Sequence, residues 1–338
     1  MPRAETGRHM EVEKIYRGKL AGFITRIIHP ERHSASMIWM VLLFLVIIVV
    51  AIVPDFIHPR NISNVLIQMV PLSLVSIGQT FVILAGGIDL SIGPQVSLIT
   101  VLASNLMQDT LWMICATVLL CLLCGIVFGF VNGILAHYVN IPPLIVTLCT
   151  GFIFQGIAFA LHKTTGGHIP DVVHEVLTAS WWILSVPLLI FIVFIFIGLW
   201  VLNRTRYGRY VYALGGNEEV LGNAGVNIGR VKIATYTIAG FLASITGVYL
   251  AARLKSGGAH YGTAFTLNSI TAVVVGGTTL GGGQGGLSGT IAGGIIVSML
   301  NNVLNNVSFR YGFQSSYYKN ILTGIILIIA MLFYRKKR

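Results

Sequence analysis

Residues 78–97 read GQTFVILAGGIDLSIGPQVS, two apolar runs joined by a glycine pair and one acid. The first run is predicted to end as a helix at Gly86-Gly87, because paired glycines favour a break. Asp89 follows, and Ser91 begins the second run. A carboxylate at the centre of a membrane costs about 2.5–3.5 kcal/mol on insertion scales, so Asp89 requires a structural or functional reason.

Two roles for Asp89 are compatible with each other. Its side chain can accept from the backbone N–H of Ser91 or Ile92 and so cap the next helix. A broken helix inside a bilayer is also tolerated where it lines a cavity or is covered by protein, as at transport sites. The sequence leaves both roles open.

The composition indicates an all-α polytopic membrane protein. Of the 338 residues, 55% are hydrophobic and 10% are charged, whereas about 25% charged is usual in soluble domains. Asp89 is the only acid inside a long apolar region. The basic residues that give the net charge of +11 lie in a few segments, as the positive-inside rule requires. We therefore expect membrane lipid to surround the chain. We expect no nucleic-acid partner, because no basic groove with interleaved aromatics is present.

About ten apolar stretches have the length of transmembrane or broken helices. They are residues 37–53, 66–85, 90–106, 111–135, 144–161, 182–202, 231–254, 267–275, 287–307 and 317–334. An even number places both termini on one side. The basic residues of 1–35, of the loop 203–230 and of the tail 335–338 then share that side, which predicts a cytoplasmic N-terminal segment, a transmembrane domain over 36–334 and a cytoplasmic tail.

Small residues and cysteines inside these stretches are interpreted as packing. Glycines at a spacing of four let helices approach closely. They form two stripes, Gly125-Gly129-Gly133 and Gly285-Gly289-Gly293. Cys121 and Cys124 are spaced C-x-x-C, but they lie in an apolar span without a nearby histidine, so no metal site is predicted.

A second glycine-rich stretch, residues 267–289, has the same plan as the first. An apolar run meets Gly276-Gly277, and small residues lead into another helix. We interpret the pair as discontinuous elements that face one another. The G-x-G-x-x-G match at Gly281, Gly283 and Gly286 is weak, because no βαβ unit surrounds it, and no phosphate-binding loop motif occurs. No nucleotide site, cofactor or catalytic residue is predicted in this chain.

The loop 203–230 reads NRTRYGRYVYALGGNEEVLGNAGVNIGR and is longer than a simple connector. Asn217 is a good N-cap, and Glu218-Glu219 suit the positive end of a helix. Gly225 can end that helix. The pattern predicts a short cytoplasmic helix of roughly two turns; the alternative is a surface turn with solvated charges.

Three segments in order, GQTFVILAGGIDLSIG, ALGGNEEVLGNAGVN and AVVVGGTTLGGGQG, resemble the membrane permease of ATP-binding-cassette sugar importers. The most similar branch takes up ribose, galactose, xylose and related monosaccharides, and the resemblance runs from about Asn61 to the tail. It implies a non-catalytic transport subunit of the bacterial inner membrane. It further implies three partners: a separate ATPase subunit, a periplasmic or surface sugar-binding protein, and a second permease copy, identical or different.

The resemblance also assigns a coupling segment that docks on the ATPase. The residues at the matching positions are Gly215, Gly216, Asn217, Glu218, Glu219, Gly225 and Val226. This chain departs from the family at 220–222, where Val-Leu-Gly replaces a small-residue pair and a basic residue. It also has Asn268 where the family commonly has an acid.

Polar residues inside apolar spans are candidates for the substrate pathway. They are Gln79, Asp89, Gln95, Asn132, Asn301 and Asn302. Each is alternatively an interhelical hydrogen bond, worth about 0.6–2 kcal/mol. Gln79 and Gln95 flank the predicted break.

Other classes of function stay open from the sequence. An ion-coupled secondary transporter is compatible with broken helices, although one intramembrane acid is a small supply of ionisable groups. A passive channel or a non-transport protein would leave the elaborate loop 203–230 without a purpose. Within the importer class, nucleosides, autoinducer-type furanoses and branched amino acids are alternative solutes.

Overall fold

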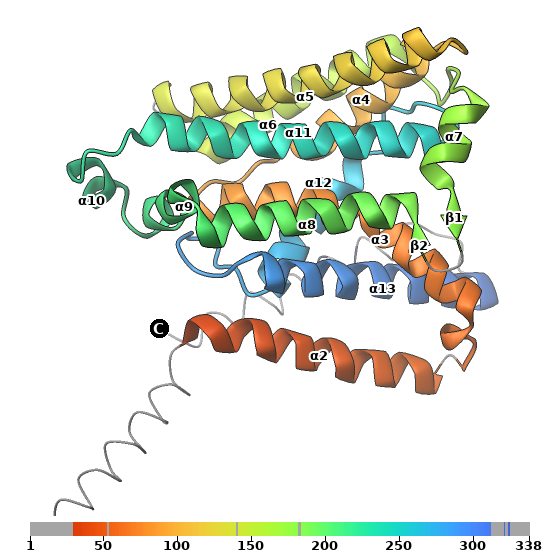
Figure 1. Cartoon of the computed structure of the whole chain (residues 1–338), viewed down its shortest axis with the longest axis horizontal. Coiled ribbons are helices and arrows are strands. Elements are labelled where there is room, and N and C mark those ends of the chain that lie inside the picture. The colour runs from red at the N-terminus through yellow and green to blue at the C-terminus, as the bar shows by residue number, and fades with distance from the viewer. Residues whose placement is uncertain are drawn as a thin grey trace, which may run out of the picture.

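The computed structural model describes residues 30–52, 54–139, 141–181 and 184–311, together with Ile321 and Gly324. Its long helices lie roughly alongside one another. The short helices α9 and α10 lie at one end of the bundle, and α7 with the strands β1 and β2 lies at the other (Figure 1). The two ends are called the α10 end and the α7 end below.

The elements follow one another along the chain with short connections. Their bounds are α2 Pro30–Ile52, η1 Pro54–Ile57, α3 Pro59–Leu84, α4 Ile92–Leu106, α5 Leu111–Tyr138, α6 Pro143–Leu161, α7 Asp171–Thr178, β1 Ser180–Trp181, β2 Leu184–Ser185, α8 Val186–Arg204, α9 Arg206–Gly216, α10 Glu218–Asn223, α11 Ile228–Leu254, α12 Thr263–Val275 and α13 Leu287–Tyr311.

Nine of the ten predicted apolar stretches coincide with apolar helices, which confirms the all-α membrane class. Several boundaries were wrong. Helices α2, α3 and α12 begin earlier than predicted, at Pro30, Pro59 and Thr263. Helix α8 begins at Val186, because Ser180 pairs with Ser185 in a short antiparallel hairpin before it. The tenth stretch, 317–334, most of the N-terminal segment and the tail 335–338 lie outside the described residues.

Burial divides the long helices into an inner and an outer set. In α3 and α11, 83% and 67% of the most apolar window is buried, compared with 22% in α5 and α8 and 33% in α6. Hydrocarbon lipid accepts apolar side chains as readily as a protein core does. Helices α5, α6 and α8 are therefore outer helices with exposed apolar faces, and α3 and α11 form the interior.

The predicted glycine stripes hold this interior together, with one correction. Helix α11 packs on α5 so closely that a Cβ on Gly125 would lie 2.5 Å from the carbonyl oxygen of Gly240. Gly289 and Gly293 face α12 in the same way, against Gly276 and Ala272. Gly285 is not part of that stripe, because it precedes α13 and has a φ of +113°.

The α5–α11 contact yields a test of stability. Gly240→Ala adds a Cβ that would overlap the Gly125 carbonyl and approach Gly129 N at 2.9 Å. Overpacking of this kind costs about 1–3 kcal/mol, so we expect less folded protein after heating in detergent, measured by size-exclusion chromatography. The matched control is Gly156→Ala, where nothing lies within 4 Å of the added Cβ. Equal losses in both variants would contradict this packing.

Candidate functional site

The first predicted helix break is present, and its geometry is specific. Helix α3 ends at Leu84, and Gly86 adopts a φ of +80°. Gly86 N donates to Ile83 O and Gly87 N donates to Val82 O, both at 2.9 Å. This bond pair is the Schellman motif, in which a left-handed residue lets the chain turn back on the last carbonyls. Glycine suits Gly86 because a Cβ would be strained there.

The second glycine-rich stretch ends in the same motif, so the predicted similarity is structural. Helix α12 ends at Val275 and Gly277 has a φ of +90°. Gly277 N donates to Val274 O at 2.9 Å, and Thr278 N donates to Val273 O at 3.1 Å. The two broken elements meet directly, because Gly283 N donates to the Leu84 carbonyl at 2.9 Å.

Asp89 lies in a buried polar network just after the first break. Its Oδ1 accepts from Ser91 N at 2.8 Å, as predicted for a cap, and from Ser91 Oγ at 2.6 Å. Ser91 Oγ in turn accepts from Gln95 Nε2 at 2.8 Å and from Asn132 Nδ2 at 2.7 Å. All four side chains are fully buried. Ser91 is thus the hub that joins the broken segment to α4 and α5.

Two further side chains hold the backbone of the broken segment. Gln79, with its amide oriented to suit its neighbours, donates to the Asp89 carbonyl and accepts from the Asp89 N–H, both at 3.2 Å. Thr147 of α6 accepts from Leu90 N at 3.1 Å and donates to Ile88 O at 3.0 Å. Buried backbone groups outside a helix need such partners at membrane depth.

The network retains unused acceptors. Asp89 Oδ2, Gln95 Oε1 and Asn132 Oδ1 are buried, and they have no hydrogen-bond partner within the described part of the chain. The hydroxyl of Tyr236 lies close to where Gly87 would carry a Cβ, and it too is buried without a hydrogen-bond partner in the described part of the chain. The hydrogen bonds show that this cluster supports the local structure, whereas its contact with a substrate stays a prediction.

Asn301 and Asn302 lie apart from this network. They sit well along α13, and the neighbouring Met299 packs against Phe56 and Val65, near the start of α3. Gln79 is 14 residues further along α3 than Val65, which corresponds to roughly 21 Å of helix. The structure thus separates the six predicted pathway residues into a group of four near the α10 end and a pair toward the α7 end.

The loop 203–230 forms two short helices, each with a side-chain cap. Thr205 caps α9 by accepting from Gly208 N, and Asn217 caps α10, as predicted, by accepting from Val220 N at 3.0 Å. Gly225 ends α10 with a φ of +79°, also as predicted. Glu218 pairs with Lys232 at 2.7 Å and ties α10 to α11. The predicted helix of roughly two turns is six residues long.

The α9–α10 element contacts both helix breaks through four glycines, Gly86, Gly215, Gly282 and Gly283, here called the glycine junction. A Cβ on Gly215 would overlap the Leu84 carbonyl oxygen, and one on Gly282 would lie 2.8 Å from the Gly215 Cα and from Gly86 N. Tyr212 of α9 also donates to the Gly285 carbonyl at 3.1 Å. Backbone therefore meets backbone at the glycine junction, where α9 touches both broken elements.

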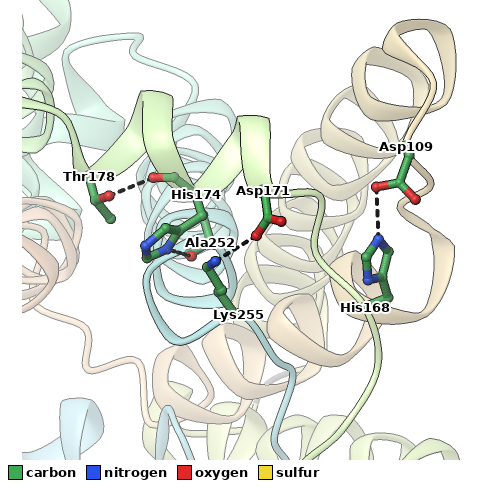
Figure 2. Close-up of polar contacts among 7 residues, drawn as sticks. All are labelled: Asp109, His168, Asp171, His174, Thr178, Ala252 and Lys255. Atoms are coloured by element: carbon green, nitrogen blue, oxygen red, sulfur yellow. Dashed lines mark hydrogen bonds and ion pairs between the residues drawn. The ribbon is translucent and has the colours of Figure 1, made fainter.

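The α7 end is fastened by exposed polar contacts (Figure 2). Asp171 at the start of α7 pairs with Lys255 at 2.6 Å, and His174 contacts the Ala252 carbonyl at 2.9 Å. His168 contacts Asp109 at 2.9 Å. The hydrogen bond from Lys255 lowers the pKa of the Asp171 carboxyl, so this link is present at neutral pH and is lost in acid.

Metal-binding clusters are not found among the described residues, where no group of three or more His, Cys, Asp or Glu side chains could hold an ion. Cys121 is fully buried and packs with Ala103, Val248 and Ala251. It fills the interface between helices, as predicted.

This arrangement of apolar helices, two buried breaks and a capped element at one end defines a multi-pass membrane permease. The chain belongs to the family of permease components of the branched-chain amino acid transport system, whose pattern matches residues 61–331. It is 37% identical over 301 residues to the ribose import permease protein of Bacillus subtilis (strain 168), covering 87% of this chain and 91% of that protein.

Further relatives agree with this assignment. The ribose import permease protein of Escherichia coli (strain K12) is 34% identical over 304 residues, covering 88% of this chain and 92% of that protein. The galactose/methyl galactoside import permease protein of Haemophilus influenzae (strain ATCC 51907 / DSM 11121 / KW20 / Rd) is 31% identical over 267 residues, covering 73% and 80%. No solved structure shows significant similarity. The chain is accordingly a multi-pass protein of the inner membrane.

Several residues of the site were not identified from the sequence. Thr147 lies 57 residues from Leu90 in the chain, and an isolated threonine in an apolar span carries no distinguishing signal. Tyr236 is likewise a single aromatic in an apolar helix. The hub role of Ser91 had a weak signal, since Ser91 directly precedes α4 and lies two residues from Asp89.

Removal of the hub yields a second test. Ser91→Ala leaves Asp89, Gln95 and Asn132 without their shared partner, and each buried group left unsatisfied costs about 1–3 kcal/mol. We expect a clear loss of folded protein on heating in detergent. The matched control is Ser73→Ala, because Ser73 is also buried and its Oγ makes no hydrogen bond within the described residues. A control as damaging as Ser91→Ala would argue against the hub.

Proposed function

We propose that this chain is the transmembrane permease subunit of an ATP-binding-cassette importer that passes a monosaccharide into the cytoplasm. The observation that carries the proposal is the glycine junction, through which α9 and α10 contact both helix breaks. A permease whose conformational change is driven by a partner subunit needs a surface that binds the partner. That surface must also contact the part of the permease that moves. The named relatives that import ribose and galactose support the choice of a sugar.

The proposed partners follow from the two ends of the bundle. A separate ATPase subunit grips the α10 end, at Gly215, Gly216, Asn217, Glu218, Glu219, Gly225 and Val226. A periplasmic or surface binding protein delivers the sugar at the α7 end. A second permease copy completes the path, and the α10 end and both termini face the cytoplasm, as the basic loops favour.

The proposed mechanism is conformational. Closure of the ATPase displaces α10, α9 transmits the displacement to Gly86 and Gly282, and the broken elements change which side of the path is open. Leu84 and Gly283 move together because they share a hydrogen bond. No covalent step acts on the sugar, and hydrolysis of ATP takes place on the partner subunit.

The transport class is tested by purifying the chain with its native partners and identifying the solute held by the binding protein. In proteoliposomes, radiolabelled ribose or galactose is expected to accumulate only when ATP, the ATPase and the binding protein are present, without sensitivity to an ionophore. Accumulation by the permease alone along an ion gradient would indicate a secondary transporter. A bound leucine or nucleoside in place of a sugar would move the substrate to another class.

The coupling role is tested at adjacent glycines. Gly215→Ala places a methyl group against the Leu84 carbonyl, whereas Gly216→Ala meets nothing within 4 Å. If the added methyl group destabilises the correctly placed junction by about 1.4 kcal/mol, the population of that arrangement falls about tenfold. We therefore expect Gly215→Ala in the assembled complex to lower sugar uptake about tenfold and to abolish stimulation of ATPase activity by the binding protein, with basal ATPase activity retained. Normal uptake by Gly215→Ala would contradict transmission through the junction.

A further inference from the structure

Three exposed arginines lie where α8 ends and α9 begins, and they are here called the arginine corner. Arg204 is the last residue of α8, and Arg206 and Arg209 are among the first four residues of α9. Residues two apart in a chain have Cα atoms at most about 7 Å apart, and residues three apart on a helix are neighbours. The corner therefore gathers three positive charges at the α10 end of the bundle (Figure 1).

The turn that carries the arginine corner is fixed by hydrogen bonds. Thr205 Oγ1 donates to the Val201 carbonyl at 2.6 Å and accepts from Gly208 N at 3.1 Å. A Cβ on Gly208 would overlap the Leu202 carbonyl oxygen, so α9 folds back tightly on the end of α8. The backbone therefore presents the three arginines in a defined arrangement.

Helix α9 directs its apolar side inward and its arginines outward. The ring of Tyr207 stacks on a phenylalanine of α3, and Val211 and Leu214 are buried. Arg206 and Arg209 lie on the opposite side of the helix, one turn apart, and both are exposed. The positive side of α9 thus takes no part in the core of the chain.

The arginine corner has no carboxylate partner within the described residues. The ion pairs found there join Asp109 with His168, Asp171 with Lys255, and Glu218 with Lys232. Neighbouring like charges repel one another, and an anion bound at the corner relieves that repulsion. Guanidinium groups hold a phosphate well, because their paired N–H groups match two of its oxygens.

An exposed apolar stripe on α8 leads directly to the corner. Leu189, Val193, Phe196, Trp200 and Arg204 follow at steps of three or four residues, so they share one face of the helix. The Phe196 and Trp200 side chains are 68% and 62% exposed. Apolar, aromatic and then basic residues along one line match the hydrocarbon core, the interface and the headgroup region of a membrane. The first turn of α8, at the opposite end, carries no charge.

We propose that the arginine corner and the adjoining stripe of α8 bind one anionic phospholipid. Its phosphate lies at Arg204, Arg206 and Arg209, and an acyl chain lies on Trp200 and Phe196. Basic clusters at the ends of membrane helices attract anionic headgroups in this way. A zwitterionic lipid binds more weakly, because its ammonium group offsets the charge of its phosphate. The inference does not rest on the proposed importer function; it requires only the membrane class.

The test uses fluorescence of Trp200 in the full chain, purified in a neutral detergent. The other tryptophans are replaced by phenylalanine, namely Trp39, Trp112, Trp181 and Trp182. Phosphatidylglycerol with brominated acyl chains is expected to quench Trp200 in a saturable manner. Phosphatidylcholine with the same chains is expected to need at least about tenfold more lipid, since it lacks the net charge. Inorganic phosphate at the same concentration is expected to leave the quenching unchanged, because it supplies no acyl chain.

Arginine variants locate the headgroup. Arg204→Gln and Arg206→Gln are each expected to raise the half-saturating amount of phosphatidylglycerol about fivefold. Both side chains are exposed, so the variants are expected to elute as folded protein on size-exclusion chromatography. The matched control is Lys163→Gln, an exposed cation just beyond the end of α6, which is expected to change nothing. If the protein with a single tryptophan does not fold, the Trp200 signal is taken as the difference between wild type and Trp200→Phe.

Four results would overturn the site. Equal quenching by the two lipids, or quenching unaffected by the arginine variants, would show that the corner does not select an anionic headgroup. Displacement of the brominated lipid by inorganic phosphate would leave only a site for a free anion. Absence of quenching by either lipid in a chain that elutes as a dimer would assign the stripe to a second copy. Unchanged lipid quenching with weakened retention of the ATPase subunit in the arginine variants would assign the corner to that subunit.

Discussion

The structure depends on how backbone groups are satisfied where two helices stop inside a membrane protein. Water is not available there to bind free carbonyl and N–H groups, so each break must supply its own partners. Both breaks use a Schellman turn with glycine in the left-handed region, at Gly86 and Gly277. The carbonyl of Leu84 is satisfied by Gly283, from the other broken element. One hydrogen-bonding requirement therefore brings the two breaks together.

That meeting point explains the rest of the inner architecture. Backbone contact at the glycine junction leaves no room for side chains, so Gly215, Gly282 and their neighbours serve close approach. Behind the junction, Ser91 and Gln79 hold the segment around Asp89 against α4 and α5. Burying polar groups is expensive unless they are mutually bonded, and in this network the donors are all shared while three acceptors, Asp89 Oδ2, Gln95 Oε1 and Asn132 Oδ1, have no partner among the described residues.

The two ends of the bundle have contrasting chemistry. The α10 end presents short helices with charged caps, including the Glu218–Lys232 pair. The α7 end carries exposed polar pairs, between Asp171 and Lys255 and between Asp109 and His168. A protein partner at one end and a small polar solute at the other are consistent with this division. The outer helices α5, α6 and α8 supply an apolar frame between the two ends.

The sequence by itself determined the membrane class, because 55% of the residues are hydrophobic and only 10% are charged. The nine described apolar helices agree with that class. It also determined both helix breaks and the capped helix α10, since glycine conformations and N-caps are local properties. Tertiary structure alone decided that Gly215 touches both breaks, that Thr147 supports Leu90, and that Asn301 and Asn302 lie away from Asp89. These contacts join residues tens or hundreds of positions apart, and no local pattern encodes such distances. The start of α8 was misplaced for a similar reason, because an apolar run does not reveal that its first residues pair as a hairpin.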